Sequence, residues 1–273
     1  MGAAQWGKDG GATAAFAARK AAALQAWYEH MPVRRALRPA SGTRYFRRFD
    51  FGSLLRMHVL DTRSHRSNQL CEVRGNDLIC ERQDAPARTM LGAEQEAWLA
   101  RGMDQGPGWH FLAQQVLMLP FDVRADGVDA PVRSMDNWNG YSDARRRMAA
   151  LIAERKLRNV VIGSGDMHQH LVGYLPIDPD DPLSPPLASE FLATSVTSGG
   201  TGSPRQAHQL RTLDHNPHVA LLNNQRGYQL YCVDAGRWST DIKVLDQVDR
   251  PGGRLTSLAT YVVEHGRPGP KLS

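Results

Sequence analysis

Residues 160–170 read VVIGSGDMHQH and decide the fold that this 273-residue sequence predicts. Three β-branched residues at 160–162 predict a short buried strand, and the glycines at 163 and 165 predict a turn where that strand ends. Polar residues follow at once, at the place where open α/β sheets hold their ligand sites. The stretch therefore predicts a central strand of an α/β fold with a functional site at its carboxyl end.

Three side chains in this stretch are of the kinds that bind metal ions: Asp166, His168 and His170. Asp supplies an anionic oxygen, and His supplies an imidazole nitrogen suited to Zn, Fe or Mn. In an extended segment alternate residues point to the same side, so the spacing predicts a partial metal site. The competing interpretation is a loop turn with a hydrogen-bonded histidine, because a metal site made by protein alone needs about four ligands.

The flanking sequence has helix and strand signals in alternation before residue 165 and strand signals alone after it. Helices are expected at 14–30, 92–103 and 142–157, and strands at 44–51, 54–60, 111–119 and 159–163. Beyond a loop at 176–186, further strands are expected at 190–196, 219–222, 227–233, 238–245 and 258–263. Alternation favours a layered α/β fold, and consecutive short strands favour antiparallel pairing. We therefore expect an α/β fold with a mixed sheet.

The composition argues against several classes of protein. No run of 18 apolar residues is present, so a membrane-spanning helix is not expected. Three cysteines without a CxxC spacing (Cys71, Cys80 and Cys232) argue against a zinc knuckle or a redox pair. A disulfide between Cys71 and Cys80 stays open, because it depends on an oxidising compartment.

Positive charge raises one alternative function, the binding of nucleic acid or another polyanion. The formal net charge is +5, and residues 1–60 hold ten Lys or Arg against three Asp or Glu. A second basic cluster, Arg145–Arg147, lies on a predicted helix. Such clusters bind polyanions by releasing counterions, but a solvated helix face is the more common explanation. Because no nucleic-acid-binding motif accompanies the arginines, nucleic acid is not the favoured partner.

Seven blocks of sequence are informative because of their order. They are residues 22–32 (AALQAWYEHMP), 60–66 (LDTRSHR), 90–99 (MLGAEQEAWL), 137–141 (NWNGY), 163–168 (GSGDMH), 190–200 (EFLATSVTSGG) and 216–218 (NPH). In this order they resemble the C-terminal portion of the catalytic domain in the alkaline phosphatase D (PhoD-like) family of metallophosphoesterases. The resemblance covers residues 14–265, with a disordered leader expected at 1–13 and a tail at 266–273.

This resemblance implies a fold, an activity and a set of metal ligands. The fold is part of a four-layer α/β/β/α metallophosphatase sandwich with a mixed sheet. The activity is hydrolysis of phosphate monoesters and diesters by a metal-activated water, with iron and calcium as the family's metal ions. The family's last metal box corresponds to 163–168, so Asp166 and His168 are the expected metal ligands. His170 lies just beyond the motif, where contact with solvent or with the neighbours of a ligand is expected.

Two arginines and one short turn have open roles in the resemblance. Arg63 and Arg66 lie in the block at 60–66, and Arg63 is the candidate for contact with phosphate, because a planar guanidinium suits bidentate contact. The role that we favour for both is an ion pair that braces the strand end, with Asp61 as one partner. Asn216 and His218 either approach the substrate or stabilise a turn.

Two earlier metal boxes of the family, a Gly-Asp-x-x-Tyr type and an Asp-Asp-His-Glu type, do not occur upstream of residue 22. We therefore expect a truncated phosphoesterase with an incomplete metal centre and an uncovered sheet edge. The alternatives are a catalytically inactive relative, and a chain that completes its site with a second, N-terminal polypeptide. Family members are commonly exported, but no signal peptide is visible, so the compartment stays open.

Overall fold

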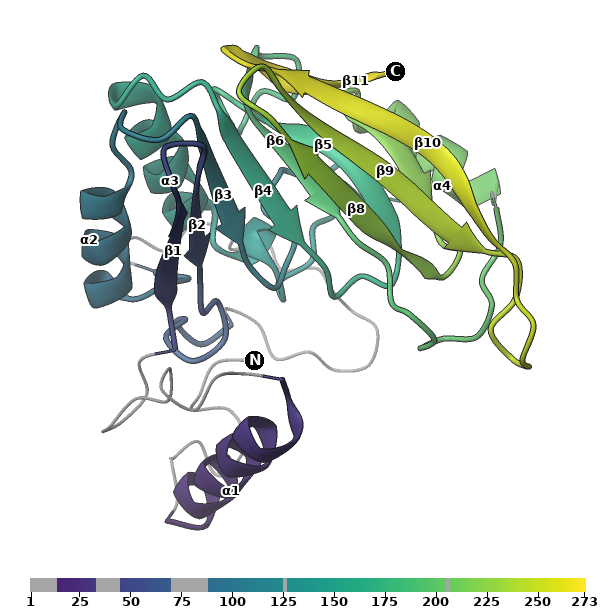
Figure 1. Cartoon of the computed structure of the whole chain (residues 1–273), viewed down its shortest axis with the longest axis horizontal. Helices are drawn as coiled ribbons and strands as arrows, with labels where there is room; N and C mark the ends of the chain where they lie inside the picture. Colours follow the sequence, from purple (N-terminus) through teal and green to yellow (C-terminus); the bar gives the residue numbers. More distant parts are fainter. Residues whose placement is uncertain (1–13, 33–44, 70–87, 125–126, 205–206) are drawn as a thin grey trace.

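The computed structural model describes residues 14–32, 45–69, 88–124, 127–204 and 207–273 (Figure 1). Two β-sheets lie face to face, and helices cover the far face of the larger sheet. The expected leader at 1–13 and the pair Cys71 and Cys80 lie outside the described residues. Cys232 is an exposed free cysteine.

The larger sheet has seven strands in the order β1-β2-β3-β4-β6-β5-β7. They are β1 (Arg47–Phe51), β2 (Leu55–Val59), β3 (Trp109–Ala113), β4 (Val160–Ser164), β5 (His170–Pro176), β6 (Pro186–Leu192) and β7 (Val219–Asn223). Strands β2, β3, β4 and β6 run parallel, whereas β1 is antiparallel to β2, and β5 is antiparallel to β6 and β7. The expected mixed sheet is confirmed, and the fully buried β4 lies at its centre.

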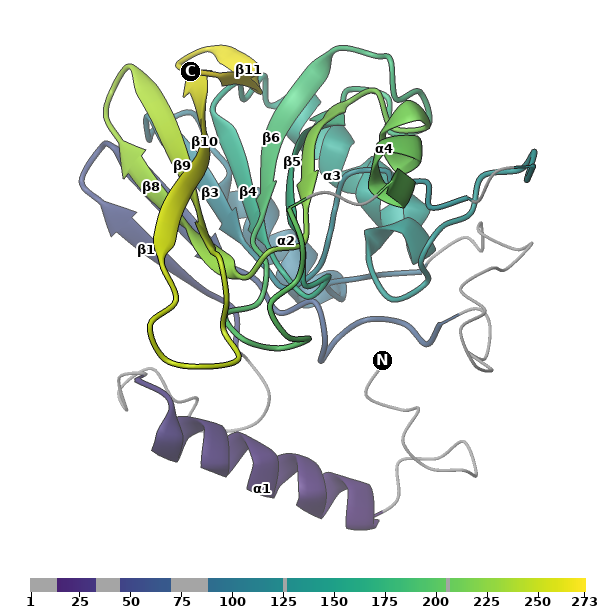
Figure 2. The same ribbon diagram turned by 90° about the vertical axis from the view of Figure 1, so that its right-hand side faces the viewer.

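Three helices cover one face of this sheet: α2 (Ala93–Gly102), α3 (Ser142–Glu154) and α4 (Ala207–Asp214) (Figure 2). Apolar side chains of α2 and α3, among them Leu99 and Ile152, form one core cluster with Leu112 and Ile162 of the sheet. Helix α1 (Ala14–His30) lies apart from both sheets in both views. In the ranges that the structure describes, no helix is long and apolar enough to cross a membrane.

The smaller sheet packs on the other face of the larger one. It is antiparallel, in the order β11-β10-β9-β8, and consists of β8 (Gly227–Val233), β9 (Arg237–Leu245), β10 (Leu255–Glu264) and β11 (Arg267–Leu272). Trp238, Ile242 and Tyr261 share a core cluster with Trp109 and Phe191 of the larger sheet. Among the described residues the layers are helices, large sheet and small sheet; a second helix layer outside the small sheet is not seen there.

Among the described residues, strand β8 lies at one edge of the smaller sheet, and its outer face is apolar. Tyr228 and Leu230 are 44% and 54% exposed, respectively, while Tyr231 faces the core. This alternation follows from the two-residue period of a strand. The sequence predicts an uncovered edge where the first strands of the central sheet are missing; β8 belongs to the smaller sheet, so that expectation stays a prediction.

The observed elements differ from the expected ones at a few places. Strand β3 ends at Ala113 instead of continuing to residue 119, because the N–H groups of Met118 and Leu119 bind the Glu190 carboxylate and leave the sheet ladder. Three elements, β5, α4 and β11, were not expected. Strand β11 occupies most of the expected tail, and its two prolines are tolerated because it is an edge strand.

Candidate metal centre after strand β4

The turn that follows β4 has a strained backbone. Asp166 and His168 have φ angles of 76° and 54°, in the left-handed region that side chains other than glycine rarely adopt. The expectation of an extended segment with alternate side chains aligned is therefore wrong. Both side chains are exposed. Because each such residue costs about 1 kcal/mol or more and persists only where the surroundings impose it, the strain marks this turn as a candidate functional site.

Close packing fixes where this turn begins. A Cβ atom on Gly163 would lie 2.5 Å from the ring of Phe111, so glycine allows β3 and β4 to pack at this point. Beyond it, the N–H of Gly165 donates to the carbonyl of Gln115 at 3.3 Å. The N–H of Ala193 donates to the carbonyl of Ser164 at 2.9 Å. The turn is thus bound to the chain that follows β3 and to the chain that follows β6.

A buried carboxylate, Glu190 on β6, lies beneath this turn. It accepts hydrogen bonds from Oγ of Ser164 at 2.6 Å and from the N–H groups of Met118 and Leu119 at 2.9 and 2.7 Å. Complete burial raises the pKa of Glu190 to about 7, against these hydrogen bonds, which favour the charged form. Glu190 therefore joins the carboxyl ends of β4 and β6 to the segment after β3. An acid inside an apolar strand is a sequence signal for such a role, although the sequence pattern alone predicts only a strand there.

Arg63 bridges two carboxylates at this end of the sheet. Its guanidinium lies 2.8 Å from Oδ1 of Asp166 and 3.1 Å from Oδ2 of Asp136. Arg66 also pairs with Asp136, at 2.8 Å, whereas Asp61 accepts hydrogen bonds from the backbone N–H of Arg63. The structure thus brings Arg63 to the expected metal ligand Asp166. The expected ion-pair role is present with partners other than Asp61.

His168 contacts a second arginine through its backbone, whereas the His170 side chain is enclosed in the fold. The carbonyl of His168 accepts a hydrogen bond from Arg226 at 2.9 Å. His170 is fully buried at the start of β5, so the expected contact with solvent is wrong. Burial lowers the pKa of the His170 imidazole to about 4. A neutral, enclosed imidazole of this kind belongs to the core.

The basic cluster 145–147 on α3 is not an open cationic face. Arg145 is fully buried, donates to Asn139 at 2.7 Å, and has its pKa lowered to about 9 by burial. Arg146 pairs with Asp180 and Arg147 with Glu96, at 2.9 and 2.8 Å. Each guanidinium is thus engaged within the fold, which weakens the case for polyanion binding here.

Asn216 and His218 brace a loop. Both are buried. Asn216 accepts from the N–H of Asp122 at 2.9 Å, and Nε2 of His218 lies 2.6 Å from the carbonyl of Pro120. These contacts fit the second of the two expected roles, stabilisation of a turn, for Asn216 and His218.

The donor atoms at the turn suit a metal ion in kind but not in number. Asp166 offers carboxylate oxygens, and His168 offers an imidazole nitrogen. Within the described ranges, no group of three or more His, Cys, Asp or Glu side chains is placed to hold an ion. The turn itself therefore supplies two ligands, fewer than the roughly four that a site made by protein alone needs.

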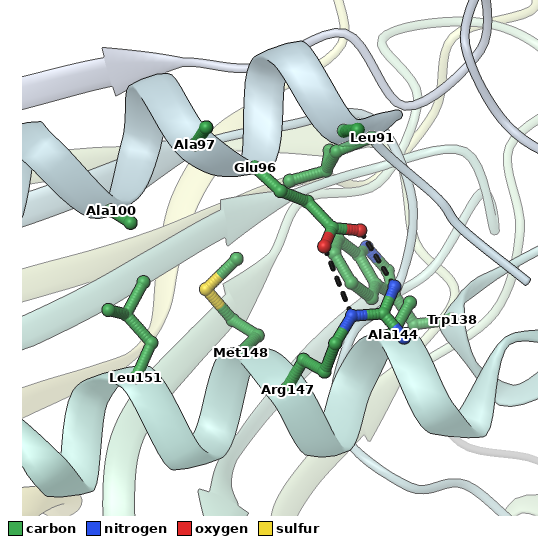
Figure 3. A pocket seen from close by; sticks show the side chains of 10 residues that line it. Leu91, Glu96, Ala97, Ala100, Trp138, Ala144, Arg147, Met148 and Leu151 are labelled. Carbon is green, nitrogen blue, oxygen red and sulfur yellow. Dashed lines mark hydrogen bonds and ion pairs between the residues drawn. The ribbon is translucent and has the colours of Figure 1, made fainter. Parts of the chain in front are cut away.

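A pocket of about 380 Å³ lies elsewhere, between α2 and α3 (Figure 3). Glu96 and Arg147 form an ion pair beside it, while Trp138, Met148 and Leu151 supply apolar walls. The lining includes neither Asp166 nor His168. The candidate metal centre is therefore an open surface turn, separate from this pocket.

A parallel strand that ends in an exposed Asp-x-His turn, beside an arginine, offers groups of the kinds that bind a cation and a phosphate. Comparison with known proteins assigns the class. The chain matches the PhoD-like phosphatase family over residues 3–242 and belongs to that family. This finding confirms the resemblance seen in the sequence.

Two members of this family are similar to the chain over nearly its whole length. It is 35% identical to alkaline phosphatase D of Bacillus subtilis (strain 168) over 264 residues, which are 96% of this chain and 45% of that protein. A solved structure of PhoD superimposes with a TM-score of 0.89 at 34% identity and covers 98% of this chain and 51% of its own. The chain thus spans about half the length of the relatives that it matches.

Proposed function

We propose that this chain forms the part of a metal-dependent phosphoester hydrolase that contributes Asp166 and His168 to the metal centre. Phosphate monoesters and diesters are the substrate class. The observation that carries the proposal is the exposed, strained turn with these two donors at the carboxyl end of β4, in a chain of the PhoD-like family. Both donors come from one turn at the end of a central strand, which is a favourable position for a ligand site.

The residues of the chain have separate roles in this proposal. A bound ion would polarise phosphoryl oxygens and lower the pKa of a bound water. Asp166 and His168 would hold that ion. The Arg63 side chain is 34% exposed and near enough to reach a phosphate, but it pairs with Asp166. Binding of a cation to Asp166 would release one arm of the guanidinium for bidentate contact with a phosphate oxygen pair.

The remaining ligands of the centre are part of the same proposal. Since the described residues supply two donors at the turn, we infer that the others come from polypeptide outside the described ranges. Iron and calcium are the ions that the family resemblance suggests. If the chain is a truncated form, the upstream part of the longer enzyme would supply the missing ligands; otherwise a complementing N-terminal polypeptide would supply them.

An inactive structural relative is the second candidate. It is favoured by one observation, the small number of donors among the described residues. In that case Arg63 would serve only as an ion-pair brace between Asp136 and Asp166.

The test is hydrolysis of a chromogenic phosphodiester with Fe, Ca, Mn or Zn added singly and in pairs. The chain is assayed alone and mixed with the part of the Bacillus subtilis relative that it does not match. We expect hydrolysis in the mixture, reduced at least about 100-fold by Asp166→Ala or His168→Ala. Asp50→Ala removes an exposed carboxylate that also pairs with an arginine, and it serves as the matched control. Absence of hydrolysis under every condition would favour the inactive relative.

A further inference from the structure

Arg226 is a buried guanidinium in the short connection between β7 and β8, with 3% of its surface exposed. It donates to the carbonyl of His168 at 2.9 Å and also to the carbonyl of Asn224. It further donates to Oγ of Ser195 at 2.7 Å and to the carbonyl of Ser198 at 2.6 Å. One side chain therefore binds both the turn after β4 and the loop 195–200.

No carboxylate among the residues with assigned positions forms an ion pair with Arg226. Its partners are three carbonyl groups and one hydroxyl group. Burying a cation without a counter-charge is costly in free energy. If position 226 served only to fill space, a neutral side chain would therefore be expected there. The planar fork of Arg can hold several acceptors at fixed angles, which Lys cannot.

The loop 195–200 lies against the same turn. A Cβ atom on Gly199 would lie 3.8 Å from Nδ1 of His168 and 3.5 Å from Nη1 of Arg226. Gly199 and Gly200 have φ angles of 84° and 71°. The loop is exposed and carries Thr197 and Ser198, whose hydroxyl groups suit an anionic ligand.

We propose that Arg226 is a positioning residue, which couples the His168 turn to the loop 195–200 so that this loop forms a wall of the phosphoester site. The inference rests on the proposed function above, because the turn is its metal-binding element. It adds that Arg226 fixes the positions of the loop and the turn relative to each other. Arg226 does so through backbone carbonyls, without touching the substrate.

Amide hydrogen exchange tests the coupling directly. In Arg226→Met we expect exchange to rise about tenfold or more in peptides that cover both 165–169 and 195–200. Arg226→Lys, which keeps the charge but loses the fork, should give an intermediate rise in both. The matched control is Arg56→Met, since Arg56 likewise binds a backbone carbonyl (of Gly102, at 2.8 Å) and two carboxylates. It should leave both peptides unchanged.

A second variant covers the case in which Arg226→Met does not fold. Ser195→Ala removes one acceptor of the guanidinium and should raise exchange in 195–200, with a smaller rise in 165–169. If folded Arg226→Met, or Ser195→Ala in its place, changes only one of the two segments, or neither, the coupling is refuted.

Metal affinity separates this inference from the proposed function. Mn²⁺ is titrated into each folded variant and free Mn²⁺ is followed by electron paramagnetic resonance. We expect about tenfold weaker binding in Arg226→Met, partial recovery in Arg226→Lys, and binding within about twofold of wild type in Arg56→Met. Equal affinity in Arg226→Met and wild type would refute the positioning role. If wild type binds no Mn²⁺ either alone or mixed with the part of the Bacillus subtilis relative that it does not match, the proposed function fails, and the exchange data alone decide whether Arg226 couples the two segments.

Discussion

Two arginine bridges lie at opposite ends of strand β2. At the amino end, Arg56 joins Asp50 and Asp104, with both distances 2.7 Å. Beyond the carboxyl end, Arg63 joins Asp136 and Asp166 at 3.1 and 2.8 Å. The two bridges are similar as ion pairs, and both lie near solvent.

The difference lies in the backbone that carries the carboxylates. Asp166 has a left-handed backbone and is followed by His168 with the same feature, whereas neither Asp50 nor Asp104 has a positive φ. Near Asp104, the histidines are buried instead: Nε2 of His110 lies 2.6 Å from the Asp104 carbonyl. An ion pair, or a histidine, is therefore weak evidence of a site by itself. Strain together with exposed donor atoms is the stronger indication.

The largest expected difference between the amino and carboxyl ends of the parallel strands is in the free energy of unfolding. Glu190→Ala would leave the hydroxyl group of Ser164 and the N–H groups of Met118 and Leu119 without their acceptor, and we expect a loss of about 3 to 4 kcal/mol in the free energy of unfolding. Asp104→Ala at the other end should cost about 1 kcal/mol or less, because the Asp104 side chain is 48% exposed and Arg56 keeps its pair with Asp50. Urea unfolding measures both. Similar losses for the two variants would mean that Glu190 does not organise the carboxyl end.

The second prediction concerns acid sensitivity at the Arg56 end. Burial and the neighbouring His110 lower the pKa of His58 to about 3, below its ordinary value of 6.5. Between these two pKa values the unfolded chain binds a proton that the folded chain does not. The contribution of the neutral His58 imidazole to the free energy of unfolding is therefore complete above about pH 6.5 and is lost as the pH falls toward 3. Between pH 7 and pH 4.5 the wild type should lose about 2 to 3 kcal/mol more than His58→Gln in urea unfolding. Equal losses would show that the His58 imidazole is protonated in the fold.

The smallest effects are expected when the two bridging arginines, Arg56 and Arg63, are replaced. Arg56→Gln and Arg63→Gln should each change the free energy of unfolding by about 1 kcal/mol or less. Arg63→Gln should also bind Mn²⁺ up to about fivefold more tightly, because Asp166 no longer has a competing cation. Arg56→Gln should leave Mn²⁺ affinity unchanged. Weaker Mn²⁺ binding by Arg63→Gln would indicate that the arginine holds Asp166 in its ligand position.

The sequence was most informative where local pattern dominates. The β-branched run before Gly163 predicted strand β4, and the composition of 142–157 predicted helix α3. Strand β11 was missed because Pro268 and Pro270 argue against a strand, although an edge strand tolerates them. Helix α4 has only eight residues, too few for a clear helical pattern.

The candidate site was predicted in part. The residue types at 166 and 168 indicate metal chemistry, but their left-handed backbone depends on tertiary contacts that spacing does not reveal. Arg226 shows the same limit, since its acceptors at 168, 195 and 198 lie 28 or more residues away. Glu190 is visible as an acid in an apolar strand, yet its partners after β3 are about 70 residues distant. Long-range polar contacts of this kind have no local pattern.

Mn²⁺ binding to the turn after β4 tests the central claim most directly. Wild type, the double variant Asp166→Ala/His168→Ala and the control Asp50→Ala are each mixed with the part of the Bacillus subtilis relative that the chain does not match, and are titrated with Mn²⁺ under the same conditions. We predict that wild type and Asp50→Ala remove free Mn²⁺ from solution equally, and that the double variant does so at least about 100-fold more weakly. Equal binding by the double variant and wild type would contradict the assignment of this turn as a metal site.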